Sequence, residues 1–179
     1  SVSLSITLTQ PTGLSVSTTV IDAVCNGSNT GAVNLTVTGG GTPYQYLWSN
    51  NATTQNLTNV TAGTYSVVVT DANTCTAATT ATVNQSGAIS VTLSKTDASC
   101  FGGANGSIST SVSGGNGGYT YIWNNSATTS TVNSLSSGTY TVTVKDVSNC
   151  SAIASATVTA PAQIQIGETH TNVACNGGS

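Results

Sequence analysis

The five cysteines of this 179-residue chain are spaced with an alternation that a repeated unit produces. A long gap from Cys25 to Cys75 is followed by a gap half as long to Cys100, and the same two gaps lead on to Cys150 and Cys175. Cys25 therefore corresponds to Cys100, and Cys75 to Cys150. At that period, residues 11–85 and 86–160 align without a gap and are identical at 28 of 75 positions. Self-similarity at a fixed period is the signature of a repeat array, so we expect tandem copies of one unit.

The period divides the chain into two complete repeats, residues 11–85 and 86–160, with a partial repeat on each side. Residues 1–10 match the end of a repeat and are predicted to be the last strand of a preceding copy. Residues 161–179 match the beginning of one and are predicted to be the first strand of a following copy. The chain is therefore expected to be a segment of a longer array. The linkers are short, which favours a stiff rod over a flexible string.

Hydrophobic and polar residues alternate with period two almost throughout each repeat, and no window shows helical periodicity. Each repeat is expected to form about six or seven short strands with turn residues roughly every 8–12 positions, as in a β-sandwich. The predicted fold is all-β, with immunoglobulin-like β-sandwich repeats arranged end to end as a rod. Trp48 and Trp123, on the third strand of each copy, are predicted to pack in the core. Tyr65 and Tyr140 are assigned to the core as well.

The order of the strands predicts how the cysteines pair. Cys100 follows the first expected strand of its repeat and Cys150 follows the fifth. Strands joined in sequence usually alternate in direction, so both cysteines should lie at the same end. We therefore predict the pairs Cys25–Cys75 and Cys100–Cys150, and a partner for Cys175 in a further repeat. Each bond would close a loop of about 50 residues, worth about 4 kcal/mol in the chain-entropy model, and would indicate an oxidising, extracellular location.

The scarcity of charge excludes several classes of function. Charged residues make up 4% of the chain, and its only cations are Lys95 and Lys145, so we expect no nucleic-acid partner. His170 is the single histidine, which leaves no repeated catalytic set and predicts neither an enzyme nor a cofactor. No apolar run approaches the ~20 residues of a membrane helix, so no membrane insertion is expected in this segment.

Asp71 and Asp146 end the most clearly alternating strand of each repeat and allow two interpretations. A calcium ion needs about six to eight oxygen ligands, which the two aspartates of each repeat hardly supply. A turn cap, in which the carboxylate accepts hydrogen bonds from the backbone just ahead, is the simpler explanation. We predict turn caps and no metal site.

Beyond the period itself, the repeat carries a long motif of glycines, aromatic residues and cysteines. In the first copy it consists of Cys25, Gly27, Gly31, Val33, Gly39, Gly40, Tyr44, Tyr46, Trp48, Ala62, Gly63, Thr64, Tyr65, Val67, Val69, Asp71 and Cys75. The second copy departs little, with Ser137 in place of the Ala. This motif resembles the SprB repeat of Bacteroidetes cell-surface proteins. The resemblance implies a very large secreted protein, exported by the type IX system, that forms surface filaments; some such proteins are adhesins carried by gliding motors.

The resemblance and the composition together favour a structural or adhesive role in a secreted cell-surface filament. The repeats would form a stiff, disulfide-locked stalk with weak multivalent adhesion along its length. Expected partners are neighbouring repeats, copies associated laterally through exposed strand edges, and surface polysaccharide. One alternative is an array of polysaccharide-binding modules in which Tyr44 and Tyr119 contact the ligand. Another is a passive spacer for an enzyme elsewhere in the parent chain.

Overall fold

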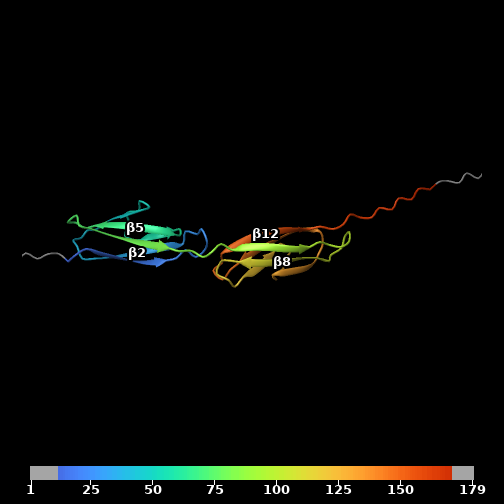
Figure 1. Ribbon diagram of the computed structural model, residues 1–179, viewed down its shortest axis with the longest axis horizontal. Helices are drawn as coiled ribbons and strands as arrows, with labels where there is room; N and C mark the ends of the chain where they lie inside the picture. The colour runs from blue at the N-terminus through green and yellow to red at the C-terminus, as the bar shows by residue number, and fades with distance from the viewer. Residues whose placement is uncertain (1–11, 171–179) are drawn as a thin grey trace, which may run out of the picture.

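The computed structural model describes residues 12–170, and within this range it contains twelve strands and no helix. The strands form two β-sandwiches that lie end to end, with the first described residues at one end of the pair and the last described residues beyond the other (Figure 1). None of the described residues belongs to a helix that could cross a membrane. The strand predicted over 1–10 lies outside the described residues. Residues 161–170 are exposed and form no strand here, so the prediction for 161–179 stays a prediction.

Each sandwich has six strands at equivalent positions. Those of the first are β1 (Ser15–Ile21), β2 (Gly31–Thr38), β3 (Gln45–Trp48), β4 (Leu57–Val60), β5 (Gly63–Thr70) and β6 (Thr76–Val83). Those of the second are β7 (Ser90–Thr96), β8 (Gly106–Ser113), β9 (Thr120–Trp123), β10 (Thr131–Leu135), β11 (Gly138–Lys145) and β12 (Ser151–Val158). The structure thus gives each repeat the same framework.

The order of the strands in the sheets identifies the sandwich type. In the first repeat one sheet has the order β1-β2-β4 and the other β3-β5-β6; the second repeat has β7-β8-β10 and β9-β11-β12. An immunoglobulin sandwich places its first, second and fifth strands in one sheet and its third, sixth and seventh in the other. The repeat follows that order, with no counterpart of the fourth strand between β3 and β4. The predicted fold class is confirmed.

The core of each sandwich lies between the two sheets around a single tryptophan. Trp48 and Trp123 are each only 2% exposed, and their indole N–H groups donate to the carbonyl oxygens of Thr54 and Thr129 at 2.8 and 3.0 Å. Because the buried indole N–H has an acceptor, the ring can fill the core without an unsatisfied donor.

Tyr65 and Tyr140 lie at the start of β5 and β11 and are half-buried against this core. Their hydroxyl groups donate to the carbonyl oxygens of Thr61 and Ser136, at 2.9 and 3.0 Å. This contact, from a tyrosine back to the backbone four residues upstream, is the tyrosine corner of immunoglobulin-like sandwiches. It fastens the turn before the strand to the strand itself.

β3 and β4 run in the same direction, although they are consecutive. β4 is parallel to β1, because both are antiparallel to β2. β3 is parallel to β6, because both are antiparallel to β5. The bridge between Ala23 and Gln85, at the ends of β1 and β6, is also parallel. All four strands therefore point the same way, and β5 runs opposite to β1.

The two short strands together make one passage along the sandwich. Trp48 of β3 pairs with Val67 in the middle of β5, while Leu57 of β4 pairs with Val33 near the start of β2. β3 thus covers one half of the length and β4 the other half, in the opposite sheet. As a result, the loops that follow β1 and β5 lie at opposite ends of the repeat.

Candidate functional site

A disulfide joins the two repeats across their junction. Cys25, after β1, is bonded to Cys150, after β11, with a Cα–Cα distance of 5.5 Å and a sequence separation of 125. The predicted pairs Cys25–Cys75 and Cys100–Cys150 are therefore wrong. They relied on each of the five strands reversing direction, whereas β3 and β4 make a single passage and place the two cysteines of one repeat at opposite ends.

The other cysteines lie away from this junction. Cys75 and Cys100 are the free cysteines among residues 12–170, and both are exposed. Cys75 follows β5 at the N-terminal end of the first sandwich, and Cys100 follows β7 at the far end of the second. Cys175, for which a partner in a further repeat was predicted, lies outside the described residues.

Hydrogen bonds from two segments hold the loop that carries Cys25. The carbonyl oxygen of Val24 accepts from the hydroxyl of Ser86, in the linker, at 3.0 Å and from the side-chain amide of Asn116, in the second repeat, at 3.4 Å. The backbone N–H of Gly27 donates to Oε1 of Gln85 at 2.7 Å. The linker and the second repeat therefore both bind the end of the first repeat, in addition to the disulfide.

The sulfur atoms border a shallow cavity formed by both repeats. Its lining residues are Cys25, Asn26, Gly87, Ala88, Ile89, Asn149, Cys150 and Ser151. Two of these, Cys25 and Asn26, come from the first repeat, and the other six belong to the second repeat. The first repeat thus inserts its loop against a surface of the second.

A buried carboxylate positions Cys150 for this bond. Asp146 is 4% exposed, and its Oδ1 accepts from the backbone N–H groups of Ser148 and Cys150, both at 2.9 Å. Its Oδ2 accepts from the backbone N–H of Asn116 at 2.8 Å. Burial alone would raise the pKa of Asp146, but these amide donors outweigh it and the pKa lies below its usual value.

Asp71 forms the same cradle in the first repeat. Its Oδ2 accepts from the N–H of Gly41 at 2.8 Å, and its Oδ1 accepts from Asn73 and Cys75 at 2.9 and 2.8 Å. The Gly41 amide contributes most to a pKa below the usual value, against the opposing effect of burial. The turn-cap prediction is confirmed at both positions. Within residues 12–170, no three His, Cys, Asp or Glu side chains are grouped so that they could hold a metal ion.

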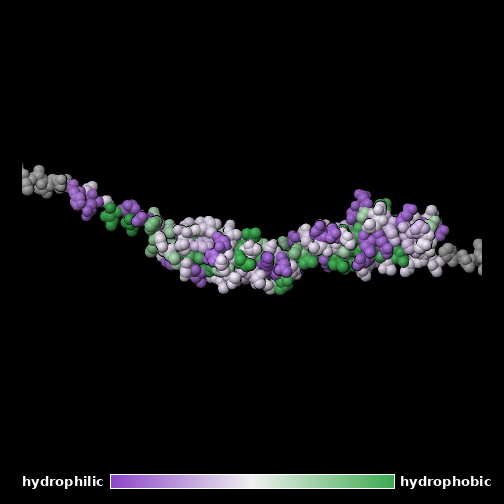
Figure 2. Space-filling model, turned by 180° about the vertical axis from the view of Figure 1, so that it is seen from behind, coloured by the Kyte–Doolittle hydropathy of each residue, from purple (hydrophilic) through white to green (hydrophobic). Residues whose placement is uncertain are grey.

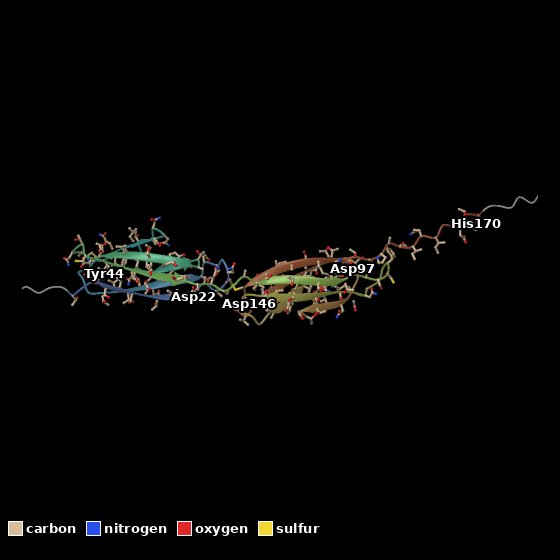
Figure 3. All side chains as sticks on the ribbon, viewed as in Figure 1. Asp22, Tyr44, Asp97, Asp146 and His170 are labelled. Atoms are coloured by element: carbon tan, nitrogen blue, oxygen red, sulfur yellow. A yellow bond between two sulfur atoms is a disulfide. The ribbon has the colours of Figure 1, made fainter. Side chains whose placement is uncertain are left out.

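A second pair of aspartates closes the other end of each sandwich. Oδ1 of Asp22 accepts from the backbone N–H of Asn84, and Oδ1 of Asp97 accepts from that of Thr159, both at 2.8 Å. Oδ1 of Asp97 also accepts a hydrogen bond from Nζ of Lys95 at 2.7 Å. This contact is the largest cause of the lowered pKa of Asp97. Figure 3 shows Asp22 and Asp146 on the two sides of the junction and Asp97 at the far end of the second sandwich.

Tyr44 and Tyr119, the candidate ligand contacts, use their hydroxyl groups within their own repeat. Both rings are half-buried against the core, and the hydroxyls donate to the carbonyl oxygens of Gly39 and Gly114. Tyr44 lies toward the N-terminal end of the first sandwich (Figure 3). The structure therefore shows a structural use for both side chains.

Six-stranded sandwiches that repeat in register and are bonded end to end define a tandem immunoglobulin-like repeat protein. Within that class, the family model of the SprB repeat matches the chain at residues 17–53 and 92–128, once in each sandwich. The starting points of the two matches are separated by one period of the cysteine pattern. SprB repeats belong to cell-surface proteins of Bacteroidetes.

Comparison with curated protein sequences finds no match. Among solved structures, the chain is similar to a C-terminal 282-residue fragment of intimin in complex with the intimin-binding domain of its translocated receptor. The identity is 15% and the TM-score 0.43, over 83% of this chain and 64% of that one. It is also similar to a variant of titin domains I67–I69, with 14% identity and a TM-score of 0.42 over 83% of this chain and 64% of that one. The N-terminal eight immunoglobulin domains of Dscam match with 11% identity and a TM-score of 0.40, over 83% of this chain and 25% of that one. The chain thus spans between a quarter and two thirds of these structures.

Proposed function

We propose that this chain is a stiff segment of a secreted cell-surface filament, serving as a stalk and carrying weak adhesive contacts along its length. The observation that carries the proposal is the disulfide between Cys25 and Cys150. Together with the linker at Gln85 and Ser86, it makes two separate covalent connections between the same pair of sandwiches. Two connections restrict bending and twisting at the junction far more than a single short linker does.

The surface supports many weak contacts over one strong site. The chain has only two cationic and five acidic residues, so charge offers no dominant binding patch. Figure 2 shows a face on which weakly polar residues dominate and apolar residues gather in small separate groups. Weak contacts that recur with each repeat give avidity without a single deep pocket. A catalytic role has no support from this arrangement, and we propose none.

Electron microscopy of intact producing cells, labelled with an antibody against residues 12–160, tests the proposal. Label spaced along thin surface filaments is expected. Label confined to the envelope, or to soluble secreted material without filaments, would contradict the proposal and favour a spacer. Cells from which the coding segment has been deleted are the matched control for antibody specificity. The same images would show whether filaments contain one chain or laterally associated copies.

A further inference from the structure

Each repeat presents one cysteine at each of its ends. Cys25 and Cys100 are equivalent positions and lie at the C-terminal ends of the two sandwiches. Cys75 and Cys150 are equivalent in the same way and lie at the N-terminal ends. Only the inner two, Cys25 and Cys150, face another repeat within the described residues, and these two are bonded. Exposed cysteines thus remain at the two outer ends.

The N-terminal end of the first repeat has the same receiving surface as the junction. A cavity there is lined by Thr12, Gly13, Leu14, Gly40, Asp71, Asn73 and Cys75. The equivalents of four of these positions in the second repeat are Gly87, Ala88, Ile89 and Cys150, which line the cavity at the junction. At the junction that cavity is completed by Cys25 and Asn26 of the neighbouring repeat. The first repeat therefore carries the same receiving half, and no loop among residues 12–170 fills it.

A side-chain amide is kept at this surface in both repeats, although its position in the sequence changes. At the junction, Asn116 supplies the amide that donates to Val24, and it also donates to the hydroxyl of Ser148. In the first repeat the equivalent residues are Gly41 and Asn73. A Cβ atom at Gly41 would lie only 2.6 Å from Nδ2 of Asn73, so the Asn73 amide occupies the space beside Gly41. The donor is thus retained by an exchange of residues.

The C-terminal end of the second repeat has the matching loop. Gly103 donates its N–H to the carbonyl oxygen of Cys100 at 3.0 Å, as Ser28 does to Cys25. The N–H of Ser99 is held by Oδ1 of Asn105 at 3.0 Å; at the junction, the equivalent N–H of Val24 is held by Thr30 at 2.9 Å. Cys100 therefore sits on a loop already folded in the shape that inserts at the junction.

From these equivalences we propose that Cys75 and Cys100 are half-sites for the same bond to further repeats in the polypeptide. Cys100 pairs with the second cysteine of the repeat that follows, and Cys75 with the first cysteine of the repeat that precedes. Each bond has the same sequence separation as Cys25–Cys150, which is 125, so successive bonds overlap. The result is a continuous series of overlapping disulfides, one at every junction between repeats.

The chemistry of each step is an exchange with a disulfide oxidant. The two protein thiols become one disulfide and lose two protons and two electrons. The oxidant disulfide takes these up and leaves as two thiols. An oxidant of this kind, or oxidised glutathione in vitro, is therefore required for the bond to form.

A chain extended by one repeat tests the proposal. Residues 161–179, which align with 11–29, are replaced by a complete copy of residues 11–85. The first repeat of this extended chain carries Cys75→Ser, and the added repeat keeps both of its cysteines. The chain is oxidised with glutathione, and free thiols are alkylated before digestion and mass spectrometry. We expect Cys100 bonded to the second cysteine of the added repeat, with at least tenfold less alkylation than in a matched control that has Ser at that added position. Equal alkylation of Cys100 in both chains, or its bonding to the first added cysteine, would overturn the proposal.

A second measurement does not depend on folding of the added repeat. Two variants of the full chain, Cys75→Ser and Cys100→Ser, each also carrying Cys175→Ser, are mixed in equal amounts with oxidised glutathione. Complementary ends should make mixed dimers, joined from Cys100 of one to Cys75 of the other, exceed half of all dimers. The statistical proportion of one half, with a quarter of each homodimer, would count against complementarity. Neither measurement uses cells or filaments, so its outcome is independent of the proposed adhesive role.

Discussion

The N-terminal ends of the two repeats have the same local structure and different surroundings. The backbone N–H groups of Cys75 and Cys150 each donate to the aspartate that ends the preceding strand, at 2.8 and 2.9 Å. Cys75 is exposed and free, whereas Cys150 is 8% exposed and bonded to the neighbouring repeat. The repeat itself thus sets the position of its cysteine, and Cys150 is paired where the neighbouring repeat presents Cys25.

The largest expected effect follows from removing the Cys25–Cys150 bond, because this disulfide is the second covalent connection between the two repeats. A protease recognition sequence inserted between Ser86 and Gly87 allows the linker to be cut. Without reduction, the cut chain should still migrate as one species, because Cys25 remains bonded to Cys150. The same chain with Cys25→Ser should separate completely into two fragments. The Cys75→Ser variant, changed at the free end, should behave like the parent; separation of the unreduced parent would contradict the observed pairing.

The two cores offer the next comparison, since each has one buried tryptophan. Trp123→Ala should cost about 3–5 kcal/mol, a large share of the roughly 4–11 kcal/mol expected for a domain of this size. Hydrogen exchange followed by mass spectrometry should show loss of protection in residues 86–160 while residues 12–85 stay protected. Trp48→Ala should give the mirror image. Equal loss in both repeats from either variant would show that the sandwiches fold as one unit.

The carboxylate cradles predict a stability that depends on pH at both ends. Asp71 and Asp146 have lowered pKa values in the folded protein, so their stabilisation is present above the unfolded value of about 3.9 and is lost as the pH falls through the folded values. The Tm should therefore fall as the pH decreases from about 4 toward 2.

A variant with both Asp71→Asn and Asp146→Asn isolates this contribution. Its Tm at pH 7 should be lower than that of the parent. In each variant side chain an NH2 group replaces one carboxylate oxygen, so one of the backbone N–H donors in the turn loses its acceptor. Its Tm should also vary less between pH 2 and pH 4, with Asp97 as the remaining aspartate whose pKa is lowered. If Tm fell with pH by the same amount in parent and variant, these two carboxylates would not be the cause of the pH dependence.

The smallest expected effect concerns the two tyrosines that precede the third strand of each repeat. Tyr119→Phe removes the hydrogen bond to Gly114 and keeps the ring against the core. Urea unfolding should show a loss of about 0.5–1.5 kcal/mol, the usual net contribution of one such bond. Tyr44→Phe should give a similar loss in the first repeat. No change in either variant would indicate that water replaces the bond in full.

Much of the fold follows from the sequence because each repeat obeys simple local rules. Alternation located the strands, the tryptophan pattern located the core, and the aspartates at strand ends were correctly predicted as turn caps. The cysteine pairing was not found, because it depends on strand direction rather than strand existence. Four residues of β3 rise about 13 Å, against about 26 Å for the eight of β5. The shortness of the third and fourth strands was thus the signal that neither spans the sandwich alone.

The long sequence separation of the junction disulfide also determines how the protein would bear tension. A pull on the chain enters at Cys25 and leaves at Cys150 through the sulfur atoms, so residues 26–149 are outside the load path. Of the strands, only β1 and β12 carry the force; β2 to β11 are bypassed. At ~3.3–3.6 Å per residue, the bypassed segment holds roughly 410–450 Å of contour length that unfolding cannot release. The oxidised pair of repeats can therefore lengthen only through the segments outside the disulfide loop, by detachment of β1 and β12 from their sheets.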